Sequence, residues 1–136
     1  MTLVRLLIQM KKQNTIKNKN LTPHQEHVMF GKGTEIPFTS PMLSMKDSGV
    51  YTCANCGYVL FDSDSKFDSG TGWPSFDRPK DSLKMKIDEG FFMTNIEIVC
   101  PKCGAHLGHV FDDGPTETGK RYCINGCALD FEKIQK

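Results

Sequence analysis

Six cysteines carry the clearest chemical signal in this sequence of 136 residues. Four of them form two CxxC pairs, CANCG at 53–57 and CPKCG at 100–104, and a glycine follows each pair. Two tight turns of this kind present four thiolates to one centre, and four sulfur ligands are typical of a structural zinc site. Such a site is closed and leaves no position for a substrate. We therefore expect one structural Zn²⁺, bound by Cys53, Cys56, Cys100 and Cys103.

The spacing leaves alternatives open for this centre. The two pairs are 43 residues apart, whereas a simple zinc ribbon has about 15–20, so the intervening chain must itself be folded. Iron could take the same four sulfurs in a rubredoxin-like centre. A Cys2His2 centre could instead combine the second pair with His106 and His109, but the first pair would then have no partner. We therefore expect the two histidines to serve another purpose.

The stretch RYCINGCAL at 121–129 holds the remaining two cysteines. We predict a continuous strand from Arg121 to Phe131, in which Arg121, Cys123 and Asn125 share one face because side chains alternate. An unperturbed cysteine titrates near about 8.5, and a neighbouring guanidinium lowers that pKa. We therefore expect Cys123 to be largely thiolate at neutral pH. From spacing alone, a core cysteine beside an exposed arginine is the other interpretation.

The rest of the chain indicates a mainly β protein with one short helix. LTPHQEHVMFGKG at 21–33 predicts a helix with Thr22 as N-cap and Pro23 at its first position, ended by Gly31 or Gly33. SLKMKIDEGFFMTNIEIVC at 82–100 alternates apolar and polar residues on both sides of DEG, which predicts an antiparallel hairpin with its turn at 88–90. We expect further strands at 50–53 and 58–61.

Length and charge restrict the classes of function. Lys plus Arg is 17 against Asp plus Glu 16, a net charge of +1, so we expect neither nucleic acid nor a membrane as partner. Residues 1–20 are basic and contain no acid, and we predict a disordered or weakly ordered tail before a single domain at 21–136. A targeting segment is the other interpretation of the tail. Because the cysteines occur without a secretory signal, we expect a protein of a reducing compartment, the cytoplasm. A secreted disulfide scaffold is the alternative.

Three further motifs occur together with both CxxC pairs. They are KFDSGTGWPSF at 66–76, which contains the only tryptophan, GAHLGHVFDDGP at 104–115 and RYCIN at 121–125. In this order, and from about Leu21 to Phe131, the chain resembles the B-type methionine-R-sulfoxide reductases. The resemblance implies two antiparallel sheets in a β-tent-like arrangement that flank the active site, with zinc remote from the chemistry. We also expect a monomer.

The resemblance further implies a reaction and a role for several residues. The R epimer of methionine sulfoxide in peptides or proteins would be reduced through a cysteine sulfenic acid, which a thioredoxin-like or other thiol reductant then reduces. Cys123 would be the nucleophile, and His106 and His109 would hydrogen-bond or protonate the leaving oxygen. Trp73 would receive the substrate's methyl group. The resemblance also assigns Arg121 and Asn125 to positioning the thiolate, and Asp113 to supporting the histidine side of the site.

Two positions depart from the family pattern. Many members have a recycling cysteine where this chain has Thr71, and Gly126 and Cys127 replace a serine followed by a small residue. Cys127 is then a possible resolving cysteine, although four residues of strand span about 13 Å and disulfide α-carbons lie within about 4.4–6.8 Å. We regard a small buried residue as the better interpretation of Cys127. Outside this family, the alternatives are a rubredoxin-like electron carrier and a zinc-ribbon binding module.

Overall fold

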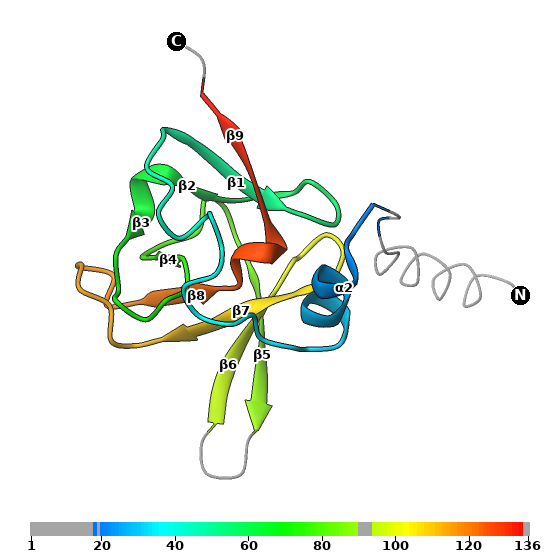
Figure 1. Ribbon diagram of the computed structural model, residues 1–136. Helices are drawn as coiled ribbons and strands as arrows, with labels where there is room; N and C mark the ends of the chain where they lie inside the picture. Colours follow the sequence, from blue (N-terminus) through cyan, green and yellow to red (C-terminus); the bar gives the residue numbers. More distant parts are fainter. Residues whose placement is uncertain (1–17, 19, 90–93, 135–136) are drawn as a thin grey trace, which may run out of the picture.

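Two antiparallel sheets and one helix make up the protein, as a computed structural model shows for residues 18, 20–89 and 94–134 (Figure 1). This confirms the predicted mainly β class with two antiparallel sheets. In chain order the elements are α2 (Pro23–Phe30), β1 (Gly49–Cys53), β2 (Val59–Asp62), the 3₁₀ turn η1 (Ser63–Ser65), β3 (Lys66–Phe67), β4 (Ser75–Phe76), β5 (Lys84–Glu89), β6 (Thr94–Val99), β7 (His106–Phe111), β8 (Arg121–Ile124), the 3₁₀ turn η2 (Gly126–Ala128) and β9 (Leu129–Lys133).

The helix α2 begins and ends as predicted. The Thr22 hydroxyl accepts a hydrogen bond from the backbone N–H of Gln25, whose side chain in turn accepts one from the backbone N–H of Thr22. Such a capping box satisfies two amides that the first turn leaves without partners. Gly31 is the C-cap, and the helix packs its buried side chains Val28 and Met29 toward β7 and η2.

The two sheets meet through an aromatic core. The smaller sheet has the order β2-β1-β9, and the larger has the order β3-β4-β8-β7-β6-β5. Phe61 on β2 stacks on Phe76 of β4 with ring centroids 4.2 Å apart, and Tyr51 on β1 meets the same ring edge-on at 5.1 Å. All three side chains are fully buried. Because Phe76 directly follows Ser75, the strand neighbour of Cys123, this core supports the strand that carries the candidate nucleophile.

The predicted continuous strand at the end of the domain is wrong. Its first part is β8, at the centre of the larger sheet, and its last part is β9, at the edge of the smaller one. Between them the chain turns through η2, where the N–H of Ala128 donates to the carbonyl of Asn125. The chain must leave the strand here because the two halves pair with strands of different sheets. Asn125 is the N-cap of this turn, with an extended backbone.

The hairpin of β5 and β6 is confirmed, but its turn lies further along the chain than predicted. Asp88 and Glu89 still belong to β5 and pair with Asn95 and Thr94, whereas residue 90 lies outside the described residues. β5 is the last strand of the larger sheet and projects with β6 away from the body (Figure 1). This position explains why Ile87 is 69% exposed despite the alternating pattern.

The prediction for the N-terminal tail falls mostly on residues 1–17 and 19, which lie outside the described residues. Asn18 is described, and its backbone N–H and side-chain amide donate to the side chain and the carbonyl of Asn55. Over the part of the chain that the structure describes, no helix combines the length and apolar character that a membrane span needs.

Candidate active site and metal centre

The four cysteines of the CxxC pairs come together as predicted. Their sulfur atoms all lie within 4.8 Å of one another, with Cys53 Sγ 3.7 Å from Cys103 Sγ and Cys56 Sγ 3.5 Å from Cys100 Sγ. Zinc–sulfur bonds of about 2.3 Å in a tetrahedron place sulfurs roughly 3.8 Å apart. The group therefore has the donors and the spacing to hold a metal ion, and the Cys2His2 alternative is excluded because all four thiols share one centre.

Identical backbone turns build this centre. Gly57 and Gly104 have φ of 83° and 79°, and each donates its N–H to the carbonyl of the first cysteine of its pair at 2.8 Å. Glycine is the residue that adopts a positive φ without strain, so each pair closes as a compact turn. Cys53 ends β1 in the smaller sheet and Cys100 follows β6 in the larger, so a metal ion here would join the two sheets.

A separate cavity of about 290 Å³ collects most of the other predicted site residues. It lies over β7 and β8, beside the loop that precedes β4. Its walls are formed by Thr34, Thr71, Trp73, Gly108, His109, Phe111, Arg121, Cys123, Ile124 and Asn125. None of the four metal-centre cysteines lines it, so the metal could not act on a substrate there.

Sheet register brings Cys123 and His109 together. Cys123 lies on β8 between two neighbours, opposite Ser75 of β4 and opposite His109 of β7. Directly opposed residues of an antiparallel pair have β-carbons about 4.5–5.5 Å apart and point to the same face. The imidazole of His109 and the thiol of Cys123 therefore share the floor of the cavity, which suits a nucleophile and a proton donor.

Burial works against ionisation of Cys123. The desolvation of the half-buried thiol raises its pKa above the ordinary value, and this outweighs the opposite effects of the Arg121 charge and of hydrogen bonds from Thr71 and Arg121. The prediction that Cys123 is largely thiolate at neutral pH is therefore wrong. The sequence showed the neighbouring cation, but the cost of burial depends on how β8 is packed.

Asp113 fixes the position of the Arg121 side chain through an ion pair. Its Nε and Nη2 donate to the two carboxylate oxygens of Asp113 at 2.8 and 3.1 Å, and its guanidinium lies 4.5 Å from the centroid of Phe111. Arg121 hydrogen bonding lowers the pKa of the exposed Asp113 carboxyl. Asp113 does not line the cavity, and it supports the arginine side of the site instead of the predicted histidine side.

His106 does not line the cavity of Cys123 and instead lines a different one, together with Glu97. Its ring is almost fully buried, its Nδ1 lies 2.7 Å from Oε2 of Glu97, and its centroid is 5.4 Å from that of His109. Desolvation by burial lowers the pKa of His106, although Glu97 opposes this, so the neutral ring is favoured. The structure thus brings the two histidines together, but only His109 reaches the cavity.

The roles of several residues near the site could not be predicted from the sequence. Glu97 sat on the polar side of the alternating β6 pattern, yet it is buried against His106. Thr71 was noted only as a departure, but it lines the same cavity as Cys123, and its side chain is one of the groups that lower the pKa of that thiol. Glu35 is buried and accepts the Trp73 indole N–H through its backbone carbonyl at 3.0 Å. A lone acid in a polar stretch gives no indication of such contacts.

Cys127 faces a different cavity from Cys123. It lies in η2 near Glu35 and His24, and the possible ligand atoms of these three residues are within 4.8 Å of one another. Burial, and then the Glu35 carboxylate, raises the pKa of the Cys127 thiol to about 12. A protonated thiol is a poor nucleophile, so this surrounding does not favour the resolving role, which stays a prediction.

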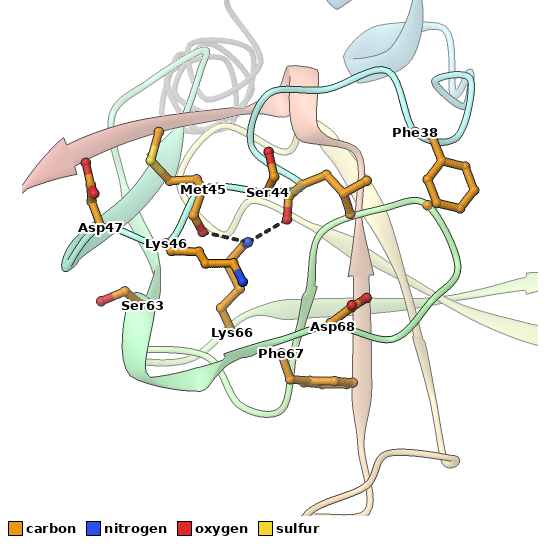
Figure 2. A pocket seen from close by; sticks show the side chains of 11 residues that line it. Phe38, Ser44, Met45, Lys46, Asp47, Ser63, Lys66, Phe67 and Asp68 are labelled. Atoms are coloured by element: carbon orange, nitrogen blue, oxygen red, sulfur yellow. Dashed lines mark hydrogen bonds between the residues drawn. The ribbon is translucent and has the colours of Figure 1, made fainter.

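The cavity in Figure 2 is lined in part by Lys66, Phe67, Asp68 and Gly72, from the segment before Trp73, and it has a different character. Its Lys66 ammonium donates to the carbonyls of Leu43 and Met45 at 2.8 and 2.9 Å, and the lining contains neither cysteine nor histidine. Gly72 borders it with φ of 95°, and a side chain there would collide with Pro37 and Phe38. This cavity therefore helps to shape the loop and offers no nucleophile.

Comparison with known proteins gives a consistent result. Residues 21–133 match the SelR domain family. The chain is 57% identical over 116 residues to the peptide methionine sulfoxide reductase MsrB of Methanosarcina barkeri, covering 84% of this chain and 82% of the relative. It is 53% identical to the MsrB protein of Leptospira interrogans, covering 85% and 89% of the two chains. It is 52% identical to the chloroplastic peptide methionine sulfoxide reductase B1 of Arabidopsis thaliana, covering 87% of this chain and 59% of the relative.

Proposed function

Because this chain belongs to the SelR domain family, we propose that it is a peptide methionine sulfoxide reductase that acts on the R epimer. The observation that carries the proposal is that Cys123, His109, Trp73 and Arg121 line one cavity of a SelR domain. That set offers a nucleophile, a hydrogen-bond donor for oxygen, an apolar face for a methyl group and a cation beside the nucleophile.

The proposed reaction moves the sulfoxide oxygen to the enzyme. The Cys123 sulfur attacks the sulfoxide sulfur, the sulfur–oxygen bond of the substrate breaks, and methionine leaves while Cys123 becomes a sulfenic acid. The Cys123 thiol is oxidised and the substrate is reduced, so no other reagent is needed for this step. Two external thiols then reduce the sulfenic acid, which yields one disulfide, one water and the free Cys123 thiol.

Selectivity for one epimer follows from three separate contacts. The sulfoxide sulfur carries a methyl group, an oxygen and the methylene of the methionine side chain. We assign the methyl to the face of Trp73, the oxygen to His109 and the methylene to the open mouth of the cavity. Exchanging the methyl and the oxygen would put an apolar group on an imidazole and a polar one on an indole. Only one epimer then presents its sulfur to Cys123.

We further propose that the metal ion is a single structural Zn²⁺, that the reductant is a thioredoxin-like protein or another thiol, and that the protein acts as a monomer in the cytoplasm. Four sulfur donors at tetrahedral spacing support zinc. All six cysteines are unpaired, which suits a reducing compartment.

The test is turnover of the separated R and S sulfoxides of an N-blocked methionine with excess dithiothreitol. We expect reduction of the R form and little of the S form, and comparable rates on both would contradict the assignment of Trp73 and His109. Cys123→Ser should abolish turnover while the protein stays folded, because the change removes the nucleophile and almost no volume. Cys127→Ser is the matched control, and a sulfenic acid trap should label only Cys123. A red protein with bound iron and no turnover would support the electron carrier instead.

A further inference from the structure

Glu35 is a buried acid that the proposed reaction does not use. It lies in the segment between α2 and β1, its side chain is only 2% exposed, and it does not line the cavity of Cys123. A buried carboxylate costs free energy unless its oxygens accept hydrogen bonds. The four hydrogen bonds that Glu35 makes all lead to the residues around the candidate site.

Two of these bonds come from the backbone of Glu35. Its N–H donates to Oδ1 of Asn125 at 3.0 Å, and its carbonyl accepts the indole N–H of Trp73 at 3.0 Å. Asn125 in turn donates its Nδ2 to the carbonyl of Leu107 at 3.0 Å. One residue therefore connects the tryptophan on one wall of the cavity to the asparagine on another.

The other two bonds are made by the carboxylate. Oε2 accepts the backbone N–H of Gly126 at 2.7 Å, and Oε1 accepts that of Cys127 at 3.0 Å. These amides open η2, the turn that follows β8 and begins at Gly126, three residues after Cys123. Hydrogen bonds to a charged acceptor are stronger than neutral ones, so the carboxylate fixes where β8 ends.

Close packing at Gly126 supports the same interpretation. A β-carbon on Gly126 would lie 2.0 Å from Oγ of Ser40 and 3.2 Å from Oε2 of Glu35. Only glycine lets the backbone approach the segment 35–40 so closely. The glycine at 126, where the family often has serine, is thus explained by contact with this segment.

We propose that Glu35 is a positioning residue, which holds Trp73, Asn125 and the turn after Cys123 in one fixed arrangement. The proposal rests on the proposed function, because it gives these three groups their tasks. Glu35 touches no substrate. It acts through its neighbours, whose relative placement decides whether the sulfoxide sulfur meets the thiol with the methyl group on the indole.

Glu35→Gln tests the role of the carboxylate. The variant keeps the backbone hydrogen bonds of residue 35 and the volume of its side chain. However, the NH₂ group of the new amide is a donor, and it would face the N–H of Gly126 or Cys127, which is also a donor. We expect kcat on the R sulfoxide to fall about 10-fold to 100-fold, with a smaller change in KM, because displacements near 1 Å can cost about 100-fold. Trp73 is the only tryptophan, so a changed emission spectrum of the folded variant reports its movement directly.

Asp77→Asn is the matched control. Asp77 is also a buried acid, 6% exposed, but its carboxylate accepts from Arg78 and it does not line the cavity. We expect a loss of melting temperature similar to that of Glu35→Gln, with unchanged kcat and unchanged emission. Wild-type kcat and emission in folded Glu35→Gln would overturn the proposal, as would an equal loss of kcat in Asp77→Asn.

Two further measurements keep the test decisive. If Glu35→Gln does not fold, Glu35→Asp keeps the charge and the backbone bonds, but its side chain is one methylene shorter and draws the carboxylate away from the N–H groups of Gly126 and Cys127. A wild-type kcat in that variant would equally overturn the proposal. If the wild-type protein does not reduce methionine sulfoxide, the proposed function fails, but the tryptophan emission and the rate of Cys123 alkylation by iodoacetamide still report the arrangement. A change of both in Glu35→Gln but not in Asp77→Asn would support the positioning role, and no change would reject it.

Discussion

Arg121 is the charge that allows a buried Cys123 to react, and Arg121→Met tests this directly. Burial raises the pKa of Cys123, and the Arg121 charge is the first of the effects that oppose it. Methionine keeps an apolar stem beside Phe111 while the cation is lost. We expect the thiolate fraction at neutral pH to fall, and with it every reaction of Cys123 that needs a thiolate.

Coulomb's law gives an upper limit for the size of the effect. A unit charge about 4 Å from a thiolate contributes about 4 kcal/mol at an effective dielectric constant of 20, which is an upper limit. Arg121 is partly exposed and shares its charge with Asp113, so solvent and the carboxylate screen much of this. Since about 1.4 kcal/mol corresponds to a factor of ten, we expect alkylation of Cys123 at pH 7 to slow by roughly 10-fold to 100-fold.

The assay is the rate of iodoacetamide labelling of Cys123 between pH 6 and pH 10, measured by peptide mass mapping on metal-loaded protein. The wild-type rate should still rise above pH 9, because the pKa of Cys123 is raised, and the variant should need more alkaline pH for the same rate. Arg78→Met is the control, since Arg78 pairs with Asp77 and does not line the cavity. A wild-type rate that levels off below pH 8, or equal profiles for wild type and Arg121→Met, would refute the reasoning.

Three further outcomes are expected. Elemental analysis should find one zinc per wild-type chain and none in Cys53→Ser. That variant should also lose much of the roughly 10–16 kcal/mol that structural zinc sites supply, and a zinc-free wild type with unchanged melting would contradict this. The free energy of unfolding should fall as pH drops below about 6.5, because burial lowers the pKa of His106 while Glu97, His109 and Lys32 face it, so the unfolded chain protonates first. Urea unfolding at pH 7.5 and 5.5 measures this, and the drop should be smaller in His106→Asn. Thr71→Cys should form a disulfide with Cys123 after one equivalent of methionine sulfoxide, since both residues line the same cavity. A persistent sulfenic acid in that variant would contradict the proximity of the two side chains.

What could be predicted from the sequence depended on interactions between residues close together in the chain. The capped helix needs only Thr22, Pro23 and Gln25, and each metal-binding turn needs only two cysteines and the glycine that follows. The family was likewise predicted, from motifs that occur in a fixed order along the chain. The hairpin of β5 and β6 was predicted from its alternation, although the length of its strands was not.

Tertiary structure alone decided how these residues act. The pKa of Cys123 depends on desolvation by strands that are distant in sequence, so the adjacent Arg121 predicted the wrong direction. Pairing with two different sheets split the last predicted strand, and that split turned Cys127 toward Glu35 and away from the cavity of Cys123. Glu35 and Glu97 look like ordinary surface acids, since nothing local reveals that Asn125 and His106, 90 and 9 positions away, will surround them. Local spacing therefore determined which side chains are candidates for the site. Packing determined their protonation, their hydrogen-bond partners and the cavity that each one faces.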